Sequence, residues 1–284
     1  MNFPALARFR ALALLPLLAL PTAGCIQFET LVKVKGDGTG TIVQTMTMSA
    51  ETMEMMKSMK SDGGKVEVGG KPMALEAKDI EQAKAEAAKM GEGVTFVKAE
   101  PIDTKEAKGM RAIYAFKDVT KLKVSQKPSS PGGAPAPGGN DVDDSMKFGF
   151  SKAANGNAVL TVAMPDLKAA ADKKAATSKT PAKAPEAPPE AMAMMKQMFK
   201  GLRIAIVIEP EGKVVQTNSP FVEGSRVTLM EMNFDALLKD EAKLKQFSAA
   251  MDSGSMADAK RLMKGLPGVK INLDPEVKIE FAAK

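Results

Sequence analysis

The chain has 284 residues, of which 40 are Lys or Arg and 34 are Asp or Glu, so its formal net charge is +6. Hydrophobic residues make up 44% of it, which is enough for a globular protein with a sizeable core. Aromatic residues are 5% and the lysines are scattered, so no basic stripe with stacking side chains indicates a nucleic-acid partner. There is no His, and the commonest general base and metal ligand are therefore missing.

The first 24 residues have the three parts of a secretory signal. Arg8 and Arg10 precede the apolar run ALALLPLLAL (11–20), and small residues follow it. A membrane-spanning helix needs about 20 apolar residues, so this run is too short to be a permanent span. We expect residues 1–24 to be a cleaved leader, and its loss lowers the net charge from +6 to +4.

The only cysteine, Cys25, follows this leader directly in the stretch LPTAGC (20–25). The stretch resembles the lipobox of bacterial lipoproteins, in which a small pair precedes a lipidated cysteine. The resemblance implies a diacylglyceryl group on Cys25 and attachment to a membrane through it. Its two acyl chains suffice for stable anchoring, and the thiol is then consumed. Because Ile26 follows rather than aspartate, the resemblance favours the outer membrane, facing the periplasm. A secretory signal with a free cysteine is the alternative.

Alternating apolar residues predict hairpins along the mature chain. The segments 28–35 and 41–48 flank the turn GDGTG, and residues 146–164 alternate on both sides of Asn155-Gly156. Asp-Gly and Asn-Gly between alternating runs are strong short-range hairpin signals. Further strands are expected at 94–98, 112–119, 202–209, 213–217, 226–232 and 277–281.

Capping residues predict several helices between these strands. A methionine-rich helix is expected over 50–60 after Ser49, and another over 80–90 after Asp79. Two more are expected after Asn233 and from Ser255 to Lys264. The predicted fold class is α+β: a mostly antiparallel β-sheet built from hairpins, with several packed helices, forming a single domain over residues 25–284.

Two segments interrupt this series of predicted strands and helices. Residues 127–143 are rich in Pro and Gly, and residues 168–190 consist almost wholly of Ala, Lys, Pro and Glu. Neither carries enough large apolar side chains to offset the entropy of ordering, so we expect both to be disordered insertions. The hairpin between them is marginally stable by itself, and we expect it to share a sheet with the rest of the chain.

Two stretches, CIQFETLVKVKGDGTGTIVQTM (25–46) and GKVVQTNSPFVEGSRVTL (212–229), resemble the LppM-type domain of bacterial envelope lipoproteins. In that group a lipidated cysteine leads into a strand, a D-G-x-G turn and a return strand. Leu229 stands where the group often carries tryptophan. The resemblance implies a β-rich envelope domain without an assigned catalytic site, and Cys25 is the one functional residue that it transfers.

Methionine is unusually frequent, with 21 residues, ten of which fall in two clusters. The first cluster consists of Met46, Met48, Met53, Met55, Met56 and Met59, and the second of Met192, Met194, Met195 and Met198. Three interpretations remain open: core packing, an adaptable apolar surface for lipid or a hydrophobic partner, and a Cu(I) site made of thioethers.

The predicted function is a lipid-anchored envelope protein that acts as a binding or scaffolding module for an apolar ligand or a protein partner. The first methionine cluster is its candidate site, and Cu(I) binding by the same residues is the alternative. Catalysis is not expected, because no nucleophile motif stands in a persuasive context. No cofactor is implied, and the acidic group Asp141, Asp143 and Asp144 is interpreted as a solvated linker end rather than a calcium site.

Overall fold

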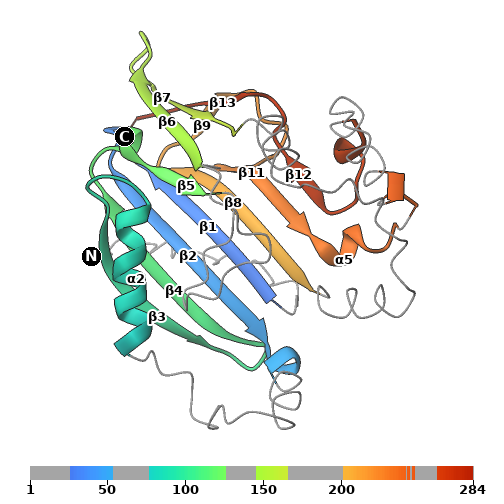
Figure 1. Cartoon of the computed structure of the whole chain (residues 1–284). Coiled ribbons are helices and arrows are strands. Elements are labelled where there is room, and N and C mark those ends of the chain that lie inside the picture. The colour runs from blue at the N-terminus through green and yellow to red at the C-terminus, as the bar shows by residue number, and fades with distance from the viewer. Residues whose placement is uncertain are drawn as a thin grey trace, which may run out of the picture.

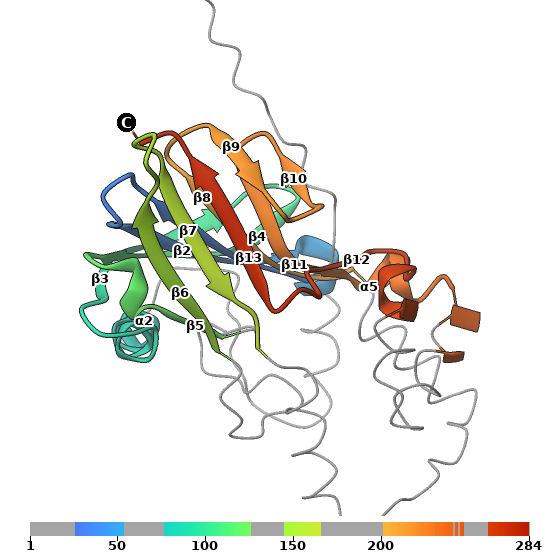
Figure 2. The same cartoon turned by 90° about the horizontal axis from the view of Figure 1, so that it is seen from above.

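The computed structural model describes residues 26–53, 77–125, 145–165, 201–240, 242–243, 245–246 and 261–283. In these ranges the chain forms two β-sheets that pack face to face (Figures 1 and 2). The predicted α+β fold with several packed helices is wrong, because strands dominate and the longest described helix is α2 (Ala77–Lys89). The capping residues predicted short helical turns correctly. The core, however, is formed almost entirely by apolar side chains of the strands, so the fold class is set by the sheets.

The larger sheet has eight strands, and β1 and β8 pair in parallel over their whole length. Its other pairs are antiparallel. The strand order is β10 (Val222–Glu223), β11 (Arg226–Asn233), β8 (Leu202–Pro210), β1 (Ile26–Val34), β2 (Gly40–Ser49), β4 (Ala107–Phe116) and β3 (Thr95–Asp103), with β12 (Val269–Ile271) paired to β11.

The smaller sheet has five antiparallel strands. Their order is β5 (Lys123–Ser125), β6 (Ser145–Lys152), β7 (Ala158–Ala163), β13 (Glu276–Phe281) and β9 (Val214–Thr217), and the short helix η1 (Val119–Lys121) precedes β5. The predicted hairpin is the β6–β7 pair, and β7 also pairs with β13 near the C-terminus. The hairpin therefore shares a sheet with distant parts of the chain, as expected.

Both predicted hairpin turns are confirmed, and each contains a glycine with positive φ. Gly38 has φ +83° in the β1–β2 turn, and Gly156 has φ +83° in the β6–β7 turn. L-residues with a Cβ adopt this conformation at a cost, so glycine is the favoured residue at both positions. In the first turn the Asp37 carboxylate accepts hydrogen bonds from the backbone and hydroxyl of Thr39, which lower the pKa of that carboxyl.

The inward-facing residues of both sheets form one hydrophobic core. The fully buried members include Val32, Ile42, Tyr114 and Ile208 from the larger sheet and Leu160, Ile279 and Phe281 from the smaller sheet. Helix α2 packs beside β3 and adds Ala83 and Ala87 to the same core, and Met90, directly after the helix, belongs to it as well. Burial raises the pKa of Tyr114, whose ring meets that of Phe96 edge to face at 6.0 Å.

Each predicted helix includes helical residues within the described ranges. Residues 50–53 are helical, and Ser49 Oγ accepts the backbone N–H of Thr52 at 3.2 Å. Helix α5 (Phe234–Leu237) has its predicted cap, since Asn233 Oδ1 accepts the N–H of Ala236 at 3.2 Å. Helix α2 begins before the predicted residue 80, and residues 261–264 are helical before Gly265.

Several predictions lie outside the described residues and stay predictions. They concern the leader 1–24, Cys25, the insertions 127–143 and 168–190, the acidic group Asp141, Asp143 and Asp144, the second methionine cluster and the domain bounds 25–284.

Candidate functional site

The larger sheet extends past the smaller one. The smaller sheet lies over one end of the larger sheet, and β1, β2 and β8 continue beyond it (Figure 1). Val32, Ile42 and Ile208 lie in the covered part and belong to the joint core. The start of β1, the end of β2 and the start of β8 lie in the part that the smaller sheet leaves uncovered. We call these two parts the closed half and the open half.

Strand register places apolar side chains side by side on the inner face of the open half. Phe28 pairs with Met46 on β2 and with Ile204 on β8. The row continues to Met110 on β4 and to Met232 on β11. Directly opposed residues share a face of the sheet, so these five side chains form one row across five strands. At about 4.8 Å between strands, the row is about 19 Å long.

A second apolar row lies nearer the end of the sheet, where Ile26 pairs with Met48 and Leu202. The two rows together are called the apolar extension, and they consist of Ile26, Phe28, Met46, Met48, Met110, Leu202, Ile204 and Met232. Met110 is 6% exposed, and the other seven side chains are partly exposed. Val32, Ile42 and Ile208 in the closed half are at most 1% exposed. The inner face thus stays apolar after the cover of the smaller sheet ends.

A polar pair separates the apolar extension from the core. Thr30 on β1 is paired with Gln44 on β2, one step further along the same face than Phe28 and Met46. The Gln44 side chain is 9% exposed, so a polar group lies at the inner limit of the apolar rows. Ligand sites that are mostly apolar use a few such polar groups to fix the orientation of the ligand.

Three of the six methionines of the predicted site lie in the described residues. Met46 and Met48 lie on the apolar extension, and Met53 lies in the helical segment 50–53 that follows β2. Met55, Met56 and Met59 are outside the described residues. The sequence interpretation missed Phe28, Ile204, Met110 and Met232 as neighbours of Met46 and Met48. The sequence shows that apolar residues alternate within each strand. Which of them become neighbours on adjacent strands depends on the strand order, which the sequence pattern does not specify.

Among the described residues, no group of three or more His, Cys, Asp or Glu side chains is arranged to hold a metal ion. No helix in the described ranges combines the length and hydropathy that a bilayer span requires.

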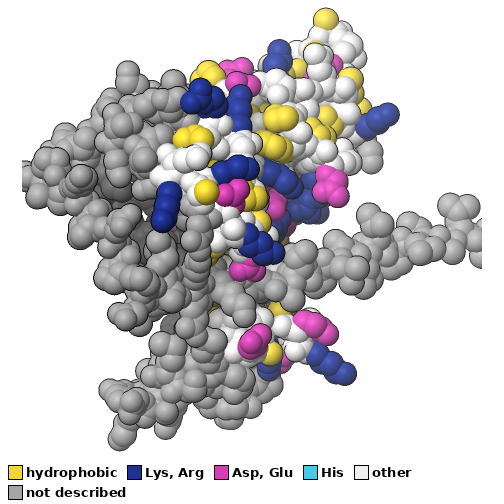
Figure 3. All heavy atoms as spheres, turned by 90° about the vertical axis from the view of Figure 1, so that its right-hand side faces the viewer, with side chains coloured by type: hydrophobic (Ala, Val, Ile, Leu, Met, Phe, Trp, Pro, Cys, Tyr) yellow, Lys and Arg dark blue, Asp and Glu magenta, His cyan; other side chains and the backbone are white. Residues whose placement is uncertain are grey.

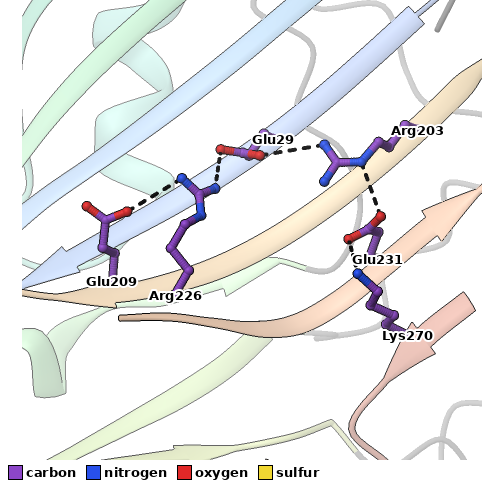
Figure 4. Close-up of polar contacts among 6 residues, drawn as sticks. All are labelled: Glu29, Arg203, Glu209, Arg226, Glu231 and Lys270. Atoms are coloured by element: carbon purple, nitrogen blue, oxygen red, sulfur yellow. Dashed lines mark hydrogen bonds and ion pairs between the residues drawn. The ribbon is translucent and has the colours of Figure 1, made fainter. Parts of the chain in front are cut away.

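The outer face of the same half carries an ion-pair network that the sequence interpretation did not find (Figure 4). Glu29 on β1 contacts Arg226 Nη2 at 2.9 Å and Arg203 Nη1 at 3.6 Å. Arg203 Nε also contacts Glu231 at 3.3 Å, and Lys270 Nζ contacts the other oxygen of Glu231 at 3.3 Å.

The network continues along the sheet to Glu209. Arg226 Nη1 lies 3.5 Å from Glu209, and Lys33 Nζ lies 3.2 Å from the other oxygen of the same carboxylate. The chain of charges therefore crosses β1, β8, β11 and β12, including the parallel β1–β8 pair.

The chemistry of this network favours a structural role. Burial raises the pKa of Glu231, but hydrogen bonds and charges from Arg203 and Lys270 outweigh it, so the pKa stays below its ordinary value. A carboxylate held ionised in this way is a poor proton donor near neutral pH. Acidic and basic side chains are interspersed on the face drawn in Figure 3, which is not the single-sign patch of a nucleic-acid site.

Comparisons with known proteins add little. No family model matches the chain, and no curated protein matches it. The structure is similar to the NMR structure of the folded domain of LppM from Mycobacterium tuberculosis, with a TM-score of 0.29 and 9% sequence identity. The alignment covers 91% of each chain. LppM is the protein group that the sequence resemblance indicated, but a TM-score this low carries no argument about fold or function.

Proposed function

We propose that the protein is a lipid-anchored cell-envelope protein that binds an apolar ligand, such as a lipid acyl chain, on the apolar extension. The observation that supports the proposal most is the row of Phe28, Met46, Met110, Ile204 and Met232 beyond the edge of the smaller sheet. The envelope location rests on the lipobox resemblance at Cys25. Outer-membrane attachment facing the periplasm remains the favoured form of the proposal.

The composition of the row suits ligands of varied shape. Methionine has an unbranched, flexible side chain with a polarisable sulfur, so a methionine-rich surface can repack around different apolar groups. Full burial of a Met, Phe or Ile side chain contributes about 1.5–3 kcal/mol. A ligand that completed the burial of several partly exposed side chains would gain a substantial part of that energy.

Binding rather than catalysis is the better interpretation of the site. The inner face of the open half is lined by apolar side chains, with Thr30 and Gln44 at its inner limit. The nearby carboxylates are engaged in ion pairs: Glu29 and Glu231 on the outer face, and Asp103 with Lys108 at the end of the inner face. A scaffold for a protein partner would use the same apolar rows, and the test below separates the two.

The test is extraction and titration of the exported Cys25→Ala protein. We expect co-purified lipid and saturable binding of a fatty acid that carries a fluorescent group. Met46→Gln, on the inner face of β2, should weaken binding at least tenfold, which is about 1.4 kcal/mol. Val43→Thr changes the outer face of the same strand and should leave the affinity within twofold. Absence of fatty-acid binding, or equal effects of both substitutions, would reject the proposal and favour a protein partner.

Cu(I) binding is the second candidate, favoured by one observation. Met46 is directly opposite Met110 and two residues from Met48, so these three methionines are neighbours on one face of the sheet. Thioethers are soft ligands that select Cu(I). Met46→Leu with Met110→Leu removes two sulfurs but keeps the surface apolar, so it should abolish Cu(I) binding and spare fatty-acid binding. A Cu(I) titration without effect on the unsubstituted protein would reject this candidate.

A further inference from the structure

We infer that the open end of the apolar extension docks on the lipid bilayer that holds the Cys25 anchor, so that its apolar rows adjoin the bilayer interior. The inference rests on the proposed function and on the predicted lipidation of Cys25. Beyond the proposed function, it specifies which end of the two packed sheets contacts the membrane, and it identifies the bilayer as the source of the apolar ligand.

Cys25 is bonded directly to Ile26, the first residue of β1. Ile26 is fixed on both sides, because it pairs with Met48 and with Leu202, and its N–H donates to Gly201 O at 3.3 Å. One residue spans at most about 3.6 Å. The lipid-bearing residue is therefore adjacent to the second apolar row, and no linker separates the folded sheet from the anchor.

Attachment through Cys25 also sets the orientation of the larger sheet on the bilayer. β1 has nine residues, and at about 3.3 Å per residue it is about 30 Å long. The Asp37-Gly38 turn lies at the far end of β1, next to the closed half. A bilayer that holds Cys25 thus meets the open half first and leaves the β1–β2 turn in the aqueous phase.

The open end of the larger sheet carries apolar side chains that a bilayer can bury. Ile26, Met48 and Leu202 are partly exposed apolar side chains at this end. Lys108 lies opposite Met48 and forms an ion pair with Asp103 at 3.1 Å, so these two charges offset one another. Transfer of the apolar side chains from water into the acyl boundary of a bilayer is favourable, and it adds to the tether.

The experiment uses the native lipidated protein in vesicles of phosphatidylethanolamine and phosphatidylglycerol. The lipid consumes the thiol of Cys25, so an introduced cysteine is the only reactive thiol. An environment-sensitive fluorophore is attached to Thr47→Cys near the open end and, in a matched control, to Lys35→Cys near the β1–β2 turn. Brominated lipids should quench the label at residue 47 at least threefold more than the label at residue 35. Equal or reversed quenching would overturn the inference, as would an intact mass that shows an unmodified Cys25.

A second variant separates docking from tethering. Twelve Gly and Ser residues inserted between Cys25 and Ile26 allow a separation of about 20 Å. Docking through the apolar side chains should preserve at least half of the quenching at residue 47, and a fall to the level of residue 35 would overturn the inference. Fatty-acid binding by the Cys25→Ala protein tests the proposed function independently, so binding without oriented quenching rejects the inference alone. Oriented quenching without fatty-acid binding rejects the proposed function alone.

Discussion

The closed and open halves of the larger sheet have similar strand chemistry but different covers. Val32 and Phe28 lie on the same face of β1, yet Val32 is fully buried and Phe28 is partly exposed. The difference arises because the smaller sheet does not cover the start of β1, which carries Phe28 (Figure 1). Apolar alternation therefore serves the core in one half and provides a candidate binding surface in the other.

The largest difference between the halves is expected in stability. Phe281→Ala in the core should lower the free energy of unfolding by about 3–5 kcal/mol, because it leaves a cavity in a fully buried site. Phe28→Ala should cost less than half as much, since its side chain is only partly buried. Urea unfolding monitored by circular dichroism measures both. Equal losses would show that the open half is packed as tightly as the core.

The two hairpin turns differ in how closely their glycines approach other side chains. A Cβ on Gly38 would lie 3.2 Å from the ring of Phe150 on the smaller sheet, whereas a Cβ on Gly156 would meet nothing within 4 Å. Both substitutions impose positive φ on alanine, which costs about 1–2 kcal/mol. Gly38→Ala should therefore lower the midpoint of urea unfolding more than Gly156→Ala. The reverse order would mean that the contact between Gly38 and Phe150 is not close in solution.

Ligand binding should distinguish the two faces of β1. Phe28→Ala should weaken fatty-acid binding about tenfold, or about 1.4 kcal/mol, because it removes the centre of the apolar row. Leu31→Ala alters a buried residue on the outer face of the same strand and should reduce stability while the affinity stays within twofold. Fluorescence titration at a temperature where both variants are folded decides the question. Equal weakening by both substitutions would argue against a ligand on the inner face.

The outer-face network should produce the smallest effect, and it should depend on pH. The pKa of Glu231 is held below its ordinary value of 4.5, so its stabilisation is fully present above pH 4.5 and is lost as pH falls through the folded-state pKa. Glu231→Gln should cost up to about 1 kcal/mol at pH 7, since the network is partly exposed to solvent. The two proteins should converge in stability as the pH falls through the folded-state pKa of Glu231. A constant difference across this range in urea unfolding would contradict the assignment.

Local features of the fold were predictable because they depend on nearby residues. Asn155-Gly156 and Asp37-Gly38 predicted both hairpin turns, and Asn233 was a correct helix cap. The prediction failed at the level of fold class. Short capped segments suggested several helices that pack on the sheet, whereas the second layer is a sheet made of β6–β7 together with β5, β9 and β13. No local pattern specifies that β7 pairs with β13, because the two strands are far apart in sequence.

Local sequence patterns specify which residues alternate along each strand and where the tight turns lie. These features follow from local backbone geometry. Long-range packing places Phe28 between Met46 and Ile204, places Glu29 between Arg203 and Arg226, and leaves the start of β1 outside the cover of the smaller sheet. Strand order and the position of the smaller sheet set these contacts, and both are products of long-range packing rather than of any local run of residues.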